Sequence, residues 1–267
     1  MGENKIIIYS LATQHENLGD LLINQTLISW LKKDYAVVIE NKGVPDWFLE
    51  RAAGTGTLKA SDNIAKYSIK SVKFYKAILF GNASVDAIVL SPGHFGDTSI
   101  RKNFKKAMLL LVAILLRMKG ISIFRVGISF GSMNFTCKLI ESLSAHVFRV
   151  YGVRDEESKN MLIPFGRKQC IVIPDLSFLA YERFRGFPDG ERQKNTLLIS
   201  FRGDRRYPKA SKMYENMIYN DIPKEAATLF EYIICYSQVK FDKYEQLKLS
   251  KLLDAGDKHV SFKEEYS

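Results

Sequence analysis

The chain opens on two apolar patterns of different period. The residues from Ile6 to Leu11 are apolar or β-favouring without a break, which indicates a buried strand. From Leu18 to Leu31 the apolar residues recur every three or four positions, which indicates a helix. The run from Tyr35 to Glu40 indicates a second strand. A strand, a helix and a strand in this order predict a parallel α/β sheet.

The same alternation continues along the rest of the chain. Further strands are predicted at 86–90, 121–126, 146–153, 169–173, 196–201, 232–237 and 259–262. Helices are predicted at 45–52, 62–80, 101–119, 241–254 and from Asp155 onward, with Asp155 as the N-cap. The glycine-bearing segments SPGHFGD and GISFGS follow two of the strands and are expected to be loops. Such loops gather at the carboxyl edge of a parallel sheet, where ligands usually bind.

One polar segment divides the pattern into two. Residues 183–194 are charged and interrupted by glycine and proline, which is typical of a linker. We therefore expect an N-terminal Rossmann-like domain at 1–182 and a C-terminal one at 195–267. The latter has 73 residues (267 − 195 + 1) with about three strands, so we expect it to be incomplete.

Charge and cysteine content narrow the class of partner. The net charge of +10 favours anionic partners, but the basic residues are scattered and no nucleic-acid-binding motif accompanies them, so no nucleic acid is expected. The three cysteines lack the spacing of a disulfide framework or a zinc site, and no metal site is expected. With no secretory signal pattern at the start of the chain, a cytoplasmic protein is expected.

The strongest apolar run, Ala107 to Leu116, has basic residues on both sides. It is about half as long as the roughly 20 residues that span a bilayer. It is either a helix packed on both sides in the core, or a helix that docks on an anionic membrane surface. The second alternative would make the protein peripheral at the inner face of the membrane.

The turn HENLGD lies between the first strand and the first helix. Asn17, Gly19 and Asp20 are placed where free backbone N–H groups and the positive end of the helix dipole could hold an anion. A purely structural role, with Asp20 as a cap and Gly19 as a turn residue, explains the same pattern equally well.

Six short motifs follow one another at domain-like intervals: NLGD, SPGHFGD, GISFGS, RDEES, DLSF and SFRGD. In this order they resemble the polysaccharide pyruvyltransferase family over almost the whole chain. The resemblance implies an α/β fold of two Rossmann-like domains, as in GT-B-type glycosyltransferases. It also implies transfer of an enolpyruvyl-derived group from phosphoenolpyruvate to a sugar, which forms a pyruvate ketal during synthesis of surface polysaccharide such as exopolysaccharide or capsule. The acceptor would be a lipid-linked or nucleotide-linked glycan, and no cofactor is implied.

This chemistry favours particular residue types. Phosphoenolpyruvate carries a carboxylate and a phosphate, so its pocket needs fixed cations and backbone N–H groups. Protonation of its methylene carbon, with attack by a sugar hydroxyl, needs an acid and a base. We expect His94, Asp20 and Asp97 to be catalytic. Substrate binding is expected from the following residues of the motifs and their loops: Asn17, Gly19, Gly93, Ser129, Gly131, Arg154, Asp155, Arg202 and Arg205. His15 is expected beside the turn, His146 at the start of a strand and His259 in the C-terminal unit.

The sequence departs from the family pattern in two places. Ser91 and Pro92 stand where the family usually has glycines, and only Gly93 matches. An Arg-Leu-His-type motif expected in the second half is absent after Ser237. We therefore expect weak binding and poor or no turnover by the chain as given. A glycosyltransferase with a nucleotide-sugar donor and a non-catalytic binding remnant are the alternative functions.

Overall fold

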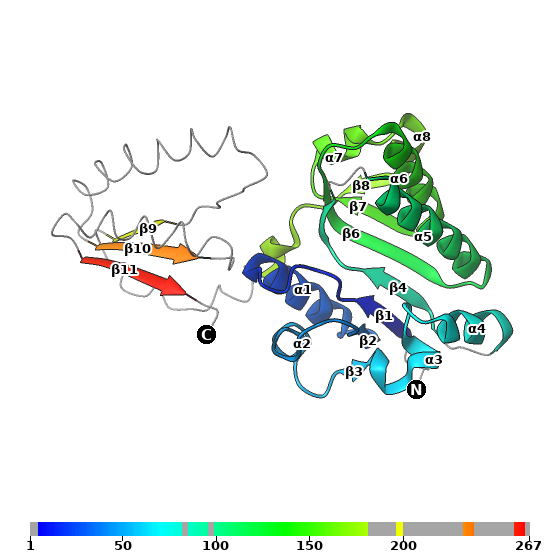
Figure 1. Ribbon diagram of the computed structural model, residues 1–267, viewed down its shortest axis with the longest axis horizontal. Coiled ribbons are helices and arrows are strands. Elements are labelled where there is room, and N and C mark those ends of the chain that lie inside the picture. Colours follow the sequence, from blue (N-terminus) through cyan, green and yellow to red (C-terminus); the bar gives the residue numbers. More distant parts are fainter. Residues whose placement is uncertain are drawn as a thin grey trace. The chain divides into compact units, whose positions relative to one another are not determined.

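The computed structural model describes residues 5–81, 85–95, 99–180, 196–199, 232–237 and 259–264. The chain divides into two compact units. The first unit is made of residues 1–15 and 20–185, and the second of residues 16–19 and 186–267. Each described unit holds a parallel sheet (Figure 1).

The sheet of the first unit is parallel throughout and has eight strands. They are β1 (Ile6–Ser10), β2 (Ala36–Glu40), β3 (Leu58–Lys59), β4 (Ala87–Leu90), β5 (Gly93–Phe95), β6 (Ser122–Phe130), β7 (Val150–Val153) and β8 (Cys170–Val172). Their order is β3-β2-β1-β4-β6-β7-β8, with β5 paired to β6. The chain therefore builds outward in both directions from β1 and β4. This order is that of a doubly wound Rossmann-type sheet, with its switch point between β1 and β4.

Helices cover both faces of this sheet. They are α1 (Leu18–Leu31), α2 (Asp46–Ala53), α3 (Ile64–Tyr67), α4 (Val72–Phe80), α5 (Ile100–Met118), α6 (Phe135–Val147), α7 (Glu156–Met161) and α8 (Pro164–Gln169), with the 3-10 turns η1 (Ala60–Asn63) and η2 (Leu176–Ala180). Successive side chains of a strand point to opposite faces. Ile7 and Tyr9 of β1 accordingly lie in one hydrophobic cluster with α1 and α2. Ile8 lies in a second cluster with α4, α5 and α6. Two cores, one on each face, hold the unit together.

The described part of the second unit is a sheet of three parallel strands. These are β9 (Thr196–Ile199), β10 (Tyr232–Ser237) and β11 (His259–Glu264), in the order β11-β10-β9. The order matches that of β3-β2-β1 in the first unit. The strands predicted at 196–201, 232–237 and 259–262 are confirmed, with ends that differ by at most two residues. The predicted helix 241–254 and linker 183–194 lie outside the described residues. The domain limits of 182 and 195 stay predictions.

The single helix predicted over 62–80 is wrong, because the chain breaks it into α3 and α4. At the break, the hydroxyl of Ser68 donates to the buried carboxylate of Glu40 at 3.0 Å. Asn63 caps the start of α3 and Ser71 caps the start of α4, each with its side-chain oxygen. Serine and asparagine favour helix starts over helix interiors, so these caps stop one helix and begin the next.

The strand predicted over 146–153 is also wrong in its first half. His146 lies in the last turn of α6, and β7 begins only at Val150. Helix α6 was not predicted, since its inward face carries buried polar residues that disguise the apolar period. The buried polar residues of α6 are Glu141, Ser142 and Ser144, which lie beside the buried Cys137 and Ala145.

The segments GISFGS and SPGHFGD were predicted to be loops, but part of each forms a strand. Strand β6 runs on through Phe130, and Gly93–Phe95 forms β5 beside it. Gly127 has a φ of +68°, and the pairing of β6 with β7 shifts register between Arg125 and Ile128. A side chain at Gly127 would come within 3.1 Å of the Pro92 ring, so the glycine permits both the irregular backbone and a close approach to the segment after β4.

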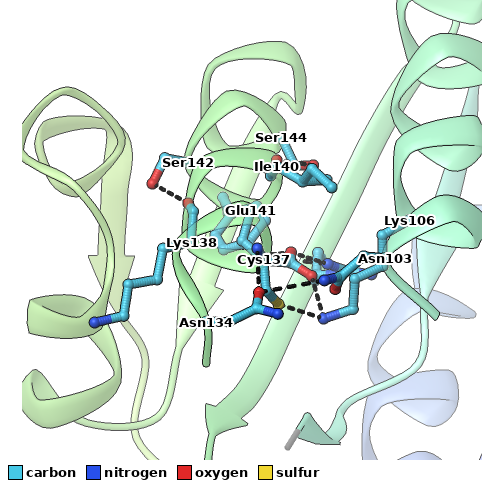
Figure 2. A network of polar contacts seen from close by, with 11 residues as sticks. Asn103, Lys106, Asn134, Cys137, Lys138, Ile140, Glu141, Ser142 and Ser144 are labelled. Carbon is cyan, nitrogen blue, oxygen red and sulfur yellow. Dashed lines mark hydrogen bonds and ion pairs between the residues drawn. The ribbon is translucent and has the colours of Figure 1, made fainter. Parts of the chain in front are cut away.

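A buried ion-pair network links α5, α6 and the sheet (Figure 2). Glu141 of α6 is 1% exposed and pairs with Arg125 of β6 and Lys106 of α5, each at 2.9 Å. Tyr151 of β7 donates its hydroxyl to the same carboxylate at 2.5 Å. Burial acts to raise the pKa of Glu141, but the charges of Arg125 and Lys106 and the hydrogen bonds outweigh it, so the pKa is lowered. The carboxylate is therefore the common partner of two cations.

Candidate functional site

The candidate site lies at the carboxyl ends of the parallel strands, on both sides of the switch point. A hydrogen bond joins the two sides, because Ser91 after β4 donates its hydroxyl to the carbonyl oxygen of Ala12 after β1 at 2.7 Å. Ser91 is buried. In open α/β sheets this crevice is the usual ligand site.

The segment between β1 and α1 is held by its own side chains. The carboxylate of Asp20 accepts from the Thr13 hydroxyl at 2.7 Å and from the backbone N–H of Gln14 at 3.1 Å. The side-chain oxygen of Asn17 accepts from the backbone N–H of Gly19 at 2.9 Å. Asp20 thus ties the chain leaving β1 to the first turn of α1. The Gly19 N–H, one of those expected to hold an anion, already has a partner in the Asn17 side chain.

His94 lies opposite Ser129 where β5 pairs with β6. Paired residues of parallel strands carry their side chains on the same face of the sheet. The His94 side chain is exposed. Ser129 in turn hydrogen-bonds Asp155, which directly follows Arg154 at the end of β7. An imidazole, a hydroxyl and a carboxylate are therefore neighbours at this edge.

Arg154 is anchored at the same edge by three contacts. Its backbone N–H donates to the carbonyl of Ile128 at 2.8 Å, and its Nε donates to the carbonyl of Gly127 at 2.8 Å. Its Nη1 pairs with a carboxylate oxygen of Asp175 at 3.2 Å. The Arg154 side chain is 22% exposed, so the guanidinium is fixed in direction and still reaches solvent.

Asp155 caps α7, as predicted. Its carboxylate accepts from the backbone N–H of Ser158 at 2.6 Å. Burial acts to raise the pKa of Asp155, but the hydrogen bonds from Ser158 and Ser129 and the charge of Arg154 outweigh it, so the pKa lies below its usual value. Asp155 is therefore held as an anion that orients Ser129 and α7.

The structure gathers five of the predicted site residues at the ends of β5, β6 and β7: Gly93, His94, Ser129, Arg154 and Asp155. Gly131 directly follows β6, and Asp20 is tied to the segment after β1. Asp97, Arg202 and Arg205 lie outside the described residues. Asn17 and Gly19 belong to the second unit, so their part in the same site stays a prediction.

Two residues of this edge were not predicted as site residues. Asp175 pairs with Arg154, and Ser91 ties the segment after β4 to the segment after β1. The sequence did contain a signal for Asp175, because this residue opens the DLSF motif shortly after a predicted strand. Arg154 was selected as a site residue because it has the same kind of position, after β7. Ser91 gave no signal of its own, because its partner is a backbone carbonyl 79 residues away.

The arrangement offers a fixed cation, hydroxyl donors and an exposed imidazole. Such groups suit a small anionic ligand and a proton transfer. Among the described residues, no group of three or more His, Cys, Asp and Glu is placed to hold a metal ion. The fold defines the class of a Rossmann-type α/β protein, with a candidate polar site at the carboxyl edge of its sheet.

The family model described as polysaccharide pyruvyl transferase matches residues 17–263, and the chain belongs to this family. The fold is similar to that of UDP-GlcNAc 2-epimerase from Neisseria meningitidis bound to UDP-GlcNAc, with a TM-score of 0.53 and 14% identity over 99% of this chain and 73% of that one. HepE from Anabaena in complex with UDP and glucose gives a TM-score of 0.48 and 10% identity over 97% and 69% of the two chains. No curated protein matches the chain in sequence. The predicted GT-B-like α/β fold is thereby confirmed.

Proposed function

We propose that the protein transfers an enolpyruvyl-derived group from phosphoenolpyruvate to a sugar and forms a pyruvate ketal in surface polysaccharide. The observation that carries this proposal is the match to the polysaccharide pyruvyl transferase family over residues 17–263. In the reaction, the methylene carbon of the donor gains a proton, the adjacent carbon forms bonds to two sugar oxygens, and inorganic phosphate leaves. Of the two protons that the sugar hydroxyls lose, one is balanced by the proton in the new C–H bond and the other by the proton on the released phosphate.

The described edge supports a donor site of this kind. Arg154 would bind a carboxylate or phosphate of the donor in place of, or beside, Asp175, which now pairs with it at 3.2 Å. Ser129 and the backbone at Gly93 and Gly131 would donate hydrogen bonds, with Asp155 holding Ser129 in place. Asn17, Gly19, Arg202 and Arg205 complete the proposed substrate-binding set.

For the proton transfers we propose His94 as the acid, because its side chain is exposed at this edge. Asp20 or Asp97 would be the base that takes the proton of the sugar hydroxyl. Both described hydrogen bonds to the Asp20 carboxylate, from Thr13 and Gln14, go to the same oxygen, Oδ2, so the sugar hydroxyl would approach the other oxygen.

We propose a cytoplasmic enzyme of two domains, 1–182 and 195–267, which takes a lipid-linked or nucleotide-linked glycan as acceptor. Cys137 and Cys170 are both unbridged and buried, which fits a reducing compartment. None of the described helices is long and apolar enough to cross a bilayer.

A ligand-dependent thermal shift tests the donor. Phosphoenolpyruvate at about 100 times its Kd should stabilise the protein by about 2.7 kcal/mol, and UDP-GlcNAc should not. Arg154→Gln should abolish the shift. The matched control is Arg51→Gln, an exposed arginine in the last turn of α2, which should keep it. Stabilisation by UDP-GlcNAc alone would replace the proposal with a nucleotide-sugar glycosyltransferase, and no shift with either ligand would favour a non-catalytic remnant.

A further inference from the structure

One helix of the first unit, α5, has a row of apolar side chains on its outer face in addition to those that it buries in the core. Along α5, seven apolar residues recur every three or four positions and are exposed; we name them the α5 stripe: Ile100, Phe104, Met108, Leu111, Ile114, Leu115 and Met118. The end residues Ile100 and Met118 are 88% and 78% exposed. At 1.5 Å per residue the stripe is about 27 Å long. Of the two alternatives that the sequence left open for this helix, packing on both sides in a core does not agree with these exposures.

The opposite face of α5 is fixed against α6 by polar contacts (Figure 2). Lys106 pairs with Glu141 at 2.9 Å and donates to the sulfur of Cys137 at 3.1 Å. Asn103 donates its amide N–H to the side-chain oxygen of Asn134 at 3.2 Å. Rotating α5 to bury the stripe would pull Lys106 away from a buried carboxylate, which is costly. The apolar face is thus held toward the outside of the unit.

The charged residues of α5 itself have one sign. Helix α5 carries five basic residues, Arg101, Lys102, Lys105, Lys106 and Arg117, and no acidic one. Arg101 and Lys105 are exposed and lie four residues apart, three residues before Phe104 and Met108 respectively. Residues three and four apart are neighbours on a helix surface, so these two cations line one border of the stripe.

A second basic feature lies at the end of the same helix. A small pocket of about 110 Å³ is lined by Arg117, Gly120, Ile121, Ser122, Ile123, Val147 and Arg149. Arg117 uses its guanidinium to donate to the carbonyls of His146 and Val147, each at 2.7 Å, and Arg149 is exposed. A phosphate group is the kind of ligand that two arginines in one pocket favour.

We propose that the α5 stripe docks on the surface of an anionic lipid bilayer. The helix would lie in the plane of the interface, with the stripe about 5–10 Å into the headgroup and acyl boundary and the bordering cations against lipid phosphates. The proposal does not depend on which reaction the enzyme catalyses. It places the amino end of α5, which follows the segment after β5, next to the membrane.

Charge decides between a bilayer and a second copy of the chain. Two α5 helices packed along the stripe would bring basic residues together without an acidic residue on either helix to balance them. An anionic bilayer supplies that balance, at a gain for each basic residue near its surface. The net charge of +10 acts in the same direction.

The test is flotation of the full chain with vesicles of phosphatidylglycerol and phosphatidylcholine, against vesicles of phosphatidylcholine alone. We expect binding to the anionic vesicles and a loss of about tenfold or more in affinity for Leu111→Gln/Leu115→Gln. The matched control is Leu58→Gln/Ile64→Gln, two leucine-sized residues of similar exposure away from α5, which should bind like the original chain. Since all four residues are exposed, equal melting temperatures should show that each variant is folded.

The charge variant Arg101→Gln/Lys105→Gln should weaken binding by about tenfold or more, and about 1 M salt should weaken it for every variant. Failure of the original chain to bind anionic vesicles would overturn the proposal, as would equal binding by the stripe and control variants. A dimer in sedimentation velocity that Leu111→Gln/Leu115→Gln converts to a monomer would assign the stripe to a second copy instead.

Discussion

Glu141 gives the most direct test of what holds the first unit together. The substitution Glu141→Gln keeps the side-chain volume and removes one negative charge from between Arg125 and Lys106. Arg125 and Glu141 have side-chain exposures of 5% and 1%, so water cannot replace the lost partner. Breaking a buried ion pair on one side costs about 3–5 kcal/mol. That is a large fraction of the roughly 5–15 kcal/mol that stabilises a typical domain.

Urea unfolding followed by circular dichroism measures this loss. The surface variant Glu156→Gln is the control, because its pair with Lys159 is 4.0 Å long and Glu156 is 70% exposed; it should lose less than about 1 kcal/mol. Lys106→Met/Arg125→Met/Glu141→Met removes all three charges of the network and should be less destabilised than Glu141→Gln alone. A loss below about 1 kcal/mol for Glu141→Gln would refute the idea that these cations depend on one carboxylate.

The same network predicts a dependence on pH. The folded pKa of Glu141 lies below its unfolded value, so the ionised carboxylate stabilises the fold above about pH 4.3, the usual pKa of glutamate. This contribution is lost as the pH falls through the lower, folded pKa. Between pH 7 and pH 3 the original chain should therefore lose more stability than Glu141→Gln does. Parallel pH profiles of the two proteins would contradict this assignment.

Two further changes probe the edge of the candidate site. Asp155→Ala removes the cap of α7 and should lower the free energy of unfolding in urea by about 0.5–2 kcal/mol. Asp155→Asn can still accept a hydrogen bond from the Ser158 N–H and should cost less. Equal losses for the two variants would argue against the cap. Gly127→Ala would place a methyl group at a positive φ and 3.1 Å from the Pro92 ring, so it should destabilise the protein by about 1–3 kcal/mol. Gly120 also has a positive φ (+83°) but has open space around it, so Gly120→Ala should cost less. The reverse order would refute the role of the Pro92 contact.

Local sequence patterns were sufficient where an element is decided by its own residues. The strands β1, β2, β4 and β8 are apolar runs between polar turns, and the structure has them within a residue or two of the predicted ends. Asp155 was identified as an N-cap because a cap is read from neighbouring residues. The alternation of strand and helix was enough to give a parallel α/β sheet and, with the motif order, the family.

Local patterns failed where a distant partner decides the structure. Helix α6 was missed because its inner face is polar, and Glu141 is satisfied there only by Arg125 and Lys106 from other elements. The break at Ser68 depends on Glu40, which is 28 residues away along the chain. The Ser91 contact, the extra strand β5 and the meeting of His94 with Ser129 likewise depend on pairing between distant segments.

The amino-acid sequence alone determined the fold class and the family, because period, turn residues and motif order are local properties, and it predicted the carboxyl edge as the place for the site. Only the tertiary structure decided which side of α5 packs against the core and which side is exposed. Its sequence pattern shows an apolar run with basic flanks, and that pattern cannot tell which side meets the core. The buried carboxylate of Glu141 draws Lys106 inward, and the α5 stripe is turned outward as a result.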